Sequence, residues 1–426
     1  MVISSEERAA VVEWIGEAAH PLGSAGPLGP VGDLRPVLGM LGDRVSVVGY
    51  GSGTRGAHEV FALQARLARL LVGEAGFRVI AFDQDWTLGV ALDTFARTGV
   101  GDPVALLGSA EPFSRTEEVL ALVEWVRAFN EGHPRDPVRL VGVSPHAVGE
   151  PAYDAVARHV REAAPERLDA LESHYAELRP GEDVAAHTRR FRGLPDRRVW
   201  LDRARAAHAL VAGLPGERDG HAWAAHAARV IVQFHELHDH DDDPLDPHNM
   251  AFFERSFAEN LLWWHRHTGH RALFWSSSSH TSNGRGRAIS FPPNPVRALP
   301  NAGSHLRDRL GRGYASIGMT FGQGELATYA DSPPHRVPPA APPLAEAVLG
   351  SGGLGDYLLD LAAGSPPRPV AEWLRRTVTL RAIGPRYDPD NDTAHHMTGG
   401  SLAEWFDIVV HQQRVTAARA LRSGRR

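Results

Sequence analysis

The 426-residue chain contains no cysteine and no lysine, so all 45 of its basic residues are arginines. Without cysteine there is no disulfide, no zinc–thiolate centre and no thiol nucleophile. Without lysine there is no P-loop lysine, no Schiff base to pyridoxal phosphate and no lysine general base. These two absences exclude several large classes of enzyme before any motif is considered.

The chain also lacks long apolar stretches and an excess of positive charge. No apolar run approaches the roughly 18 residues of a membrane-spanning helix. The first 20 residues carry Glu and Arg throughout, which is unlike a signal peptide. The formal net charge of −6 argues against a nucleic-acid binder. We therefore expect a globular, cytoplasmic protein with neither membrane nor nucleic acid among its partners.

Short β-branched runs alternate with amphipathic segments in the first third of the chain. The runs 44–50, 77–82 and 138–143 predict buried strands, and 58–73 and 116–129 predict helices between them. This alternation is typical of an α/β fold with a mostly parallel sheet flanked by helices. Further strands are predicted at 271–275, 315–321, 356–361, 378–383 and 406–410.

The middle of the chain is helical and has no strand pattern. From residue 152 to about 236 the periodicity is that of helices, and helix resumes at 250–268. We therefore predict three parts. Residues 1–150 form the first half of an α/β core, 151–245 a helical insertion, and 246–426 the second half of the core.

A glycine-rich loop follows the first predicted strand. Residues 51–56 (GSGTRG) satisfy G-x-G-x-x-G between a strand and a helix, which is the context of a dinucleotide-binding fingerprint. Asp83, however, stands further along the chain than the usual acid, and the glycines have the alternative task of a tight turn. Ser52 is no nucleophile elbow, because Tyr50 and Thr54 occupy the required glycine positions. We expect no dinucleotide cofactor.

A series of short motifs, in order between about residues 45 and 410, resembles the erythromycin esterase family. The family's first motif, G-E-x-x-H-G-x-x-E-F after a strand, is similar to residues 51–60 (GSGTRGAHEV). The other matches are an acid after G-F, E-W-x-R-x-x-N, A-E-N, W-x-H-N-x-H, G-Y-x-x-I-G-x-x-F-x-x-G and F-D-x-x-V. They fall at 76–83, 124–130, 257–260, 275–280, 313–324 and 406–410.

The resemblance implies a parallel sheet among helices, with a deep cleft over the strand ends. It also implies a chemistry in which a histidine removes a proton from water, supported by carboxylates, to open a macrolide lactone. This sequence departs from the family at those positions. The family's Glu is Ser52, and its base His is Arg55, which accepts no proton at ordinary pH. The remaining departures are Gln64 for an Arg, Asp83 for a Glu, and Ser277 for the first His of the pair.

Four residues are the candidates for catalysis, each with a structural alternative. His280 is either the surviving acid–base group or the cap of a strand end. His58 either replaces the lost base or caps the following helix. Arg55, with the loop amides, either holds an anionic oxygen within reach of Asp83 or His280, or pairs with a nearby acid. Asp83 is expected in a cleft at the end of the second strand.

A second group is predicted to bind substrate. The serines of the 276–279 run offer hydroxyl groups or form a polar turn, and the tryptophans wall a pocket or belong to the core. The predicted substrate-binding residues are Ser52, Glu59, Gln64, Asp85, Trp86, Ser277 and Ser278.

One polar stretch has the spacing of a metal site. His235, His238, His240 and the acids 241–243 resemble ligands for zinc or nickel, but such a run next to Pro244 is more typical of a solvated loop. We expect no metal.

Three functions remain open. The first is a tailoring enzyme of secondary metabolism that acts on a polyketide- or macrolide-like small molecule without net hydrolysis, by cyclisation, dehydration or isomerisation. The second is an esterase or lactonase with a relocated base. The third is a resistance protein that binds a macrolide without turnover.

Overall fold

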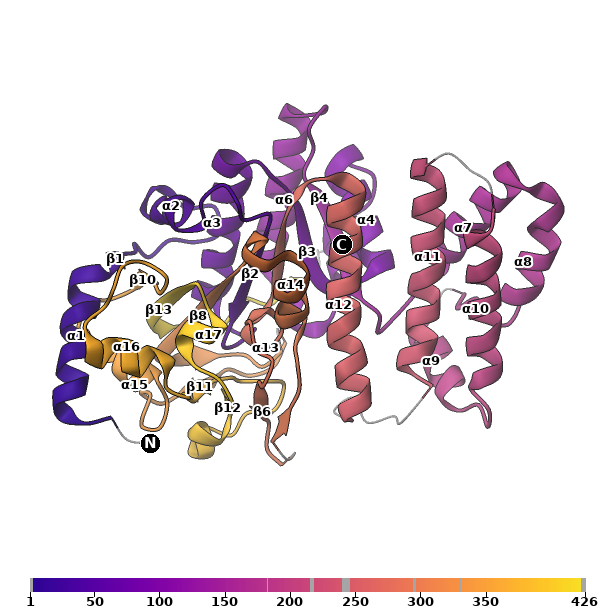
Figure 1. The fold of residues 1–426 in the computed structure, drawn as a ribbon. Helices are drawn as coiled ribbons and strands as arrows, with labels where there is room; N and C mark the ends of the chain where they lie inside the picture. The colour runs from indigo at the N-terminus through magenta and orange to yellow at the C-terminus, as the bar shows by residue number, and fades with distance from the viewer. Residues whose placement is uncertain are drawn as a thin grey trace. The chain divides into compact units, whose positions relative to one another are not determined.

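The computed structural model describes residues 3–181, 183–214, 218–239, 246–293, 296–329 and 331–422 (Figure 1). The chain forms two compact units. Unit 1 comprises Met1–Ala81, Leu92–Leu140 and His270–Arg426, and unit 2 comprises Phe82–Ala91 and Val141–Gly269.

A mostly parallel sheet forms the centre of unit 1. The strand order is β1, β10, β13, β8, β2, β5, β3, β4, and β3 and β4 enter unit 1 with residues 77–81 and 139–140. Strand β8 pairs in parallel with β2 and β13, and β2 pairs in parallel with β5. The pairs β1–β10, β10–β13 and β8–β9 are antiparallel. The bounds are β1 His20–Pro21, β2 Val47–Ser52, β3 Phe77–Asp85, β4 Arg139–Ser144, β5 Arg271–Ser277, β8 Tyr314–Leu326, β9 His335–Val337, β10 Tyr357–Asp360 and β13 Ile408–Val415.

The central strand β2 is buried along its whole length because both faces of the sheet are covered. On one face the Trp275 ring lies 5.7 Å from the Tyr50 ring and 6.2 Å from the ring of Phe61 in α3. On the other face a Cβ at Gly49 would stand 2.1 Å from the Tyr314 hydroxyl, which explains the glycine. The predicted fold class is confirmed.

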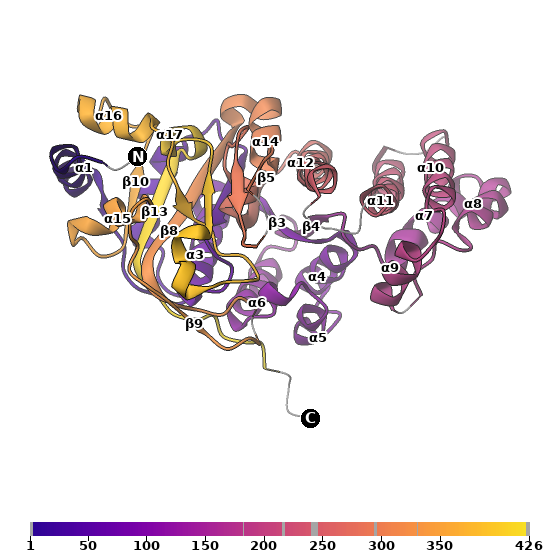
Figure 2. The ribbon, with the colours of Figure 1, turned by 90° about the horizontal axis from the view of Figure 1, so that it is seen from below.

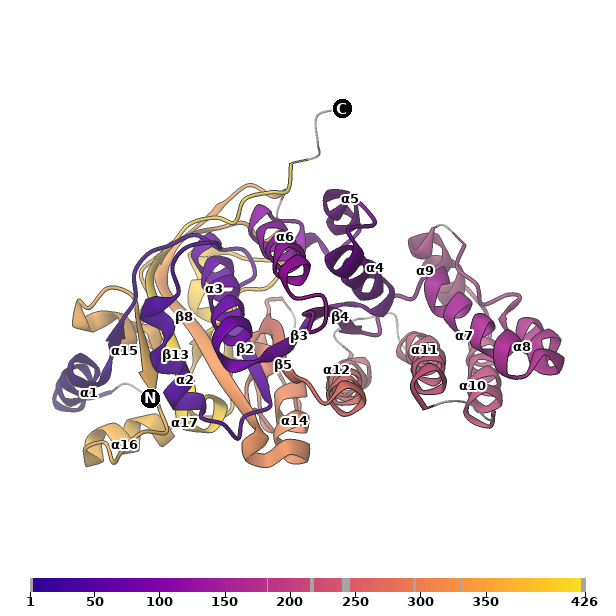
Figure 3. The same cartoon turned by 90° about the horizontal axis from the view of Figure 1, so that it is seen from above.

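Helices surround this sheet, and α3 and α6 lie side by side (Figure 3). The helices of unit 1 are α1 Ser5–Ala18, α2 Pro36–Leu41, α3 His58–Ala75, α5 Pro103–Gly108, α6 Glu117–Gly132, α13 Ser278–Thr281, α14 Ala302–Leu310, α15 Glu346–Leu349, α16 Arg368–Arg375 and α17 Leu402–Trp405. Helix α4, Trp86–Thr98, begins in unit 2 and ends in unit 1.

A small second sheet differs from the sequence prediction. The range 378–383, predicted as a strand, contributes only β11 (Leu380–Arg381) to this sheet, which continues through β12 (His396–Thr398), β6 (Ala288–Ser290) and β7 (Arg297–Ala298). Arg381, the last residue of this short strand, is buried in an ion pair with Asp392. Its Nε and Nη2 atoms donate to the two carboxylate oxygens at 3.0 and 2.7 Å.

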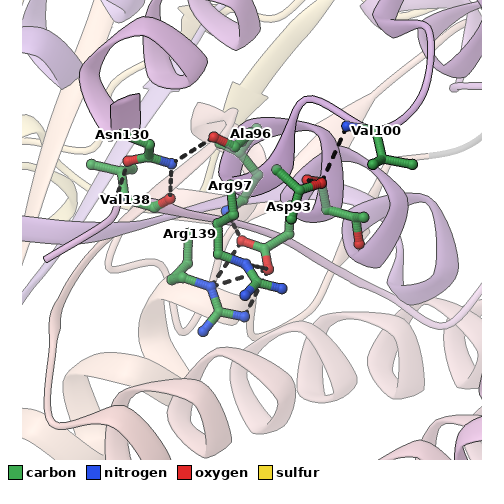
Figure 4. A network of polar contacts seen from close by, with 10 residues as sticks. Asp93, Ala96, Arg97, Val100, Asn130, Val138 and Arg139 are labelled. Carbon is green, nitrogen blue, oxygen red and sulfur yellow. Dashed lines mark hydrogen bonds and ion pairs between the residues drawn. The ribbon is translucent and has the colours of Figure 1, made fainter. Parts of the chain in front are cut away.

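Polar side chains join α4, α6 and the start of β4 inside unit 1 (Figure 4). Asp93 accepts hydrogen bonds from Arg97 Nε at 3.0 Å and from Arg139 Nη2 at 2.7 Å. Asn130 donates to the carbonyl groups of Ala96 and Val138 at 3.0 and 2.9 Å and accepts from the Val138 amide at 2.7 Å. Asn130 ends the E-W-x-R-x-x-N motif, so this motif has a structural role.

Unit 2 is mainly helical, and its helix α11 packs against α7 and α10 (Figure 1). The bounds are α7 Glu150–Ala163, α8 Leu168–Tyr175, α9 Val184–Arg192, α10 Arg198–Ala212, α11 Arg218–Leu237 and α12 Pro247–Thr268. Its core includes buried Tyr153, Phe191, Trp200 and Phe234. Within the part of the chain that is described, no helix combines the length and the apolarity needed to cross a membrane.

Candidate active site

The carboxyl ends of β2 and β5 place several predicted site residues next to one another. Ser52 is paired with Ser277 in the parallel register and with Met319 of β8 on its other side. The Ser277 and Ser279 hydroxyl oxygens are 2.6 Å apart. Ser278 begins α13, which also carries the half-buried His280. Substrate binding by these serines and proton transfer by His280 stay predictions.

The glycines of the 51–56 loop permit close backbone packing. A Cβ at Gly56 would stand 2.0 Å from the Ala327 carbonyl oxygen, and one at Gly51 would stand 2.5 Å from Ser278 Cα. Neither glycine has a positive φ, so a left-handed backbone is not the reason for the glycines, and the chain bends between β2 and α3 at residues 53, 55 and 56. The Gly53 amide donates to Met319 at 3.0 Å and the Gly56 amide to Thr54 Oγ1 at 3.2 Å. Because protein groups already accept from these amides, they do not form a cradle for a phosphate.

Arg55, which stands at the family's base position, is half-buried after this loop. Its guanidinium carbon lies 4.1 Å from the centroid of the Phe113 ring, a cation–π contact that fixes the side chain. Phe113 belongs to the short turn Pro112–Ser114 that precedes α6. The prediction that Arg55 reaches Asp83 or His280 stays a prediction.

Three predicted residues belong to unit 2. Asp83 is buried near the end of β3. Asp85 Oδ1 accepts from the Leu88 amide at 2.9 Å and from the Thr87 hydroxyl, so this carboxylate caps α4. Trp86 is buried with its ring 5.3 Å from that of Trp223. The structural alternative explains the positions of Asp85 and Trp86, and their binding roles stay predictions.

Two predicted residues on α3 make structural contacts. Glu59 accepts from the Thr416 amide at 2.6 Å and from its hydroxyl at 2.7 Å. Gln64 is fully buried, and its Nε2 donates to the carbonyl groups of Tyr50 and Ser276 at 2.9 and 3.4 Å, which links β2 to β5. Substrate binding by Glu59 and Gln64 stays a prediction.

His58, the first residue of α3, forms a dyad with a carboxylate on α6. The His58 Nδ1 lies 2.6 Å from Glu118 Oε1, and the two side chains are 16% and 1% exposed. Glu118 also accepts from the Arg419 amide at 3.2 and 3.4 Å. Because a carboxylate accepts only, Nδ1 donates in this contact, and Nε2 is the ring nitrogen that remains available to a ligand. Across the described ranges Nε2 has no hydrogen-bond partner.

This dyad lies in the wall of an open pocket of about 370 Å³ within unit 1. The volume falls in the range of small-molecule sites, about 300–1,000 Å³. The pocket is lined by the 26–29 loop, His58, Glu117, Glu118, Ala121 and Arg419. Arg419 belongs to the segment that follows β13 on the way to the C-terminus (Figure 2).

Glu118 and Arg419 are absent from the sequence-based candidates. Thr116 at the N-cap of α6 and two acids in its first turn indicate a helix start, and this signal does not reveal that Glu118 meets His58. Arg419 follows the last predicted strand and belongs to no motif. Only the folded chain brings residues 58, 118 and 419 together.

The suspected metal ligands lie partly outside the described residues, which omit His240 and residues 241–243. His235 lies on α11 and His238 directly follows that helix, and both are buried, so the solvated-loop interpretation is wrong for them. The His235 ring lies 4.8 Å from the Phe191 ring, and His238 Nε2 lies 3.0 Å from the His146 carbonyl oxygen. Among the residues that the structure describes, no three potential ligands gather as a metal site would require.

Comparisons with known proteins agree with the resemblance stated above. A family model described as erythromycin esterase matches residues 72–415. A Bacillus cereus protein of known structure has a TM-score of 0.84 at 24% identity, covering 97% of this chain and 99% of that one. A structure titled succinoglycan biosynthesis protein has a TM-score of 0.82 at 23% identity, covering 99% and 100%. An open-conformation mutant of the erythromycin esterase EreC has a TM-score of 0.65 at 12% identity, covering 92% and 96%. No curated protein gives a significant match.

Proposed function

Because the chain belongs to the erythromycin esterase family, we propose that it is an enzyme that moves a proton on a polyketide- or macrolide-like small molecule, without net hydrolysis. The reaction class is cyclisation, dehydration or isomerisation in secondary metabolism. The proposal rests on two features: arginine replaces the family's base at position 55, and another histidine, His58, follows three residues later.

The His58–Glu118 dyad is the observation that carries the proposal. In isomerisation, Nε2 takes a proton from a C–H group of the substrate, and the imidazolium that forms is stabilised by the Glu118 carboxylate at 2.6 Å. The same nitrogen then returns the proton to another atom of the substrate, so the enzyme ends unchanged. In dehydration, the returned proton leaves with a hydroxyl group as water.

Arg55 supports a reaction in which water is not the nucleophile. A guanidinium stays protonated at all ordinary pH values, so the position that holds the family's base offers a fixed positive charge here. Its cation–π contact with Phe113, at 4.1 Å, holds this charge in place. We propose that it stabilises negative charge on an oxygen of the reacting molecule, with His280 as a further polar group of the same reaction.

A hydrolase with a relocated base is the second candidate, because the same dyad would equally activate water. The description of the family as erythromycin esterase supports this alternative, whereas the non-hydrolytic reaction is supported by the replacement of the family's base. The two differ in one atom of the product, since hydrolysis adds an oxygen from solvent.

Mass spectrometry after incubation in H₂¹⁸O and in D₂O separates these functions. The substrates are fourteen- and sixteen-membered macrolides and linear polyketide acids. We expect deuterium incorporation, or loss of water, without ¹⁸O. Rapid formation of a ring-opened acid with one ¹⁸O would establish the esterase instead, and binding without any exchange would leave only a binding protein.

The variant His58→Asn tests the dyad in the same assay. Loss of a positioned general base costs about 10²–10⁴ in rate. The control is His133→Asn, because His133 is an exposed histidine of α6's C-terminal end whose ring stacks on Phe129 at 4.0 Å. Equal exchange rates in both variants would contradict the role of His58.

A further inference from the structure

The wall of the His58 pocket contains two carboxylates, of Glu117 and Glu118, and one guanidinium, of Arg419. The Glu118 carboxylate is bound by His58 and by a backbone amide. Glu117 forms an ion pair with Arg422, whose Nε lies 3.3 Å from Oε1. The guanidinium of Arg419 has no ion pair within the described ranges. Among the described residues, the pocket therefore presents one guanidinium that is not engaged in an ion pair.

The backbone fixes the position of Arg419 although its side chain is exposed. The Arg419 carbonyl accepts from the Glu117 amide at 2.9 Å, and its amide donates to Glu118. The neighbouring Ala418 amide donates to the Gly56 carbonyl at 2.9 Å. The last segment of the described chain is thus tied to the beginnings of both α3 and α6, and the free end of the guanidinium is available to a ligand.

The opposite wall is apolar and is held rigidly. Arg69 of α3 donates to the carbonyl groups of Pro27 and Gly29 at 3.1 and 2.6 Å, which fixes the 26–29 loop. Within this loop Leu28 is 57% exposed, and Ala121 of α6 also lines the pocket. An exposed leucine on an anchored loop gives an apolar ligand a surface without a cost for ordering the loop.

The pocket is open to solvent, and its volume of about 370 Å³ lies near the lower end of the range for small-molecule sites, about 300–1,000 Å³. A small acid, or the end of a longer chain whose remainder lies outside the pocket, fits this space.

We propose that this pocket binds a carboxylate-bearing molecule with a short apolar body, and that Arg419 determines this specificity. The inference rests on the proposed function, because it names the substrate class of the same site. The carboxylate pairs with the Arg419 guanidinium, the apolar body contacts Leu28, and His58 Nε2 faces the atom that loses its proton.

The test compares octanoate with octan-1-ol, which has the same chain length and no charge. Binding is measured by calorimetry, and its location by the ¹⁵N shift of the His58 ring. Arg419→Gln is expected to weaken octanoate binding about tenfold and to leave octanol binding unchanged, whereas Arg419→Lys restores part of the affinity. The control Arg414→Gln removes an exposed arginine outside the pocket and leaves both unchanged.

Each result is decisive. Equal octanoate affinity in Arg419→Gln and the native protein overturns the proposal, as does binding without a shift at His58. Failure of the proposed function gives a different result. In that case the affinity for octanoate still depends on Arg419, but His58→Asn leaves the deuterium content of the product unchanged.

Discussion

Glu346, in the first turn of α15, is a buried acid whose titration makes a measurable prediction. Its side chain is 1% exposed. Oε1 accepts from the Arg381 amide at 2.9 Å, and Oε2 has no partner in the part of the chain that the structure describes. Burial raises the pKa of Glu346 to about 7, which the nearby Arg381 charge offsets only in part.

This raised pKa determines how stability changes with pH. The unfolded chain releases the Glu346 proton near the ordinary pKa of 4.5, whereas the folded protein holds it up to about 7. The resulting stabilisation is complete below pH 4.5 and is lost as the pH rises through 7. At 1.36 kcal/mol for each pKa unit, the loss is about 3 kcal/mol.

The variant Glu346→Gln removes this titration and keeps an oxygen for the Arg381 amide. We expect the free energy of unfolding of the variant, relative to the native protein, to rise by about 3 kcal/mol between pH 4.5 and 7.5. The difference is the quantity to measure. Buried histidines with lowered pKa values, such as His226 and His411 at about 3, titrate in both proteins with the opposite slope and cancel.

Hydrogen exchange of the Arg381 amide reports on unit 1 without requiring that both units unfold together. Its protection free energy is compared between the two proteins at each pH, with urea denaturation as the second measurement. A difference that is independent of pH would refute the reasoning, because it would mean that Glu346 titrates alike in the folded and unfolded states.

Three further substitutions test the packing inside unit 1 and inside unit 2. Asp392→Asn leaves the Arg381 guanidinium buried without its counter-charge, and we expect a loss of about 3 kcal/mol in urea denaturation. Gly56→Ala places a Cβ 2.0 Å from the Ala327 carbonyl oxygen, so we expect a loss of about 1–3 kcal/mol or a failure to fold. His235→Phe removes two buried ring nitrogens that lack partners among the described residues. We expect the free energy of unfolding to increase by about 1–3 kcal/mol, which is seen as a higher melting temperature.

Matched controls separate these effects from general damage. Arg368→Ala breaks an exposed pair with Glu372 and is expected to leave stability unchanged, in contrast to Asp392→Asn. Gly16→Ala, in α1, meets no atom within 4 Å and is expected to stabilise the protein slightly. If Gly56→Ala were as harmless as Gly16→Ala, the close approach of the glycine loop to Ala327 would be wrong.

Several of the family motifs predict the scaffold because their residues hold neighbouring elements together. Asn260 in the A-E-N motif donates to the Val143 carbonyl and to Gln233 Oε1, both at 2.9 Å. Asp407 in F-D-x-x-V accepts from the Ser316 amide at 2.8 Å. These residues serve the packing of the scaffold, so the motifs that contain them can be recognised independently of the proposed catalytic positions.

Other features depend on contacts that no local pattern contains. The sequence predicts a strand at 44–50 that ends before the glycine-rich loop. In the structure β2 starts at Val47 and continues through Gly51 to Ser52. The glycines remain in the strand because the turn of α13 and the Ser278 backbone press against them. The sequence predicts only one member of the dyad, His58. Its partner Glu118 lies on a different helix, and no local pattern connects the two residues.

The order of the elements along the chain has a consequence for how the protein assembles. Strand β2 has β5 and β8 as its two neighbours, and both follow the segment Val141–Gly269 of unit 2. During synthesis, β2 therefore cannot pair with β5 or β8 until the whole helical segment has emerged. If that segment collapses first, the effective loop between β2 and β5 shortens, and a tenfold shortening lowers the entropic cost of closure by about 2 kcal/mol. Substitutions that delay the collapse of unit 2 are thus expected to delay the pairing of two strands that lie wholly in unit 1.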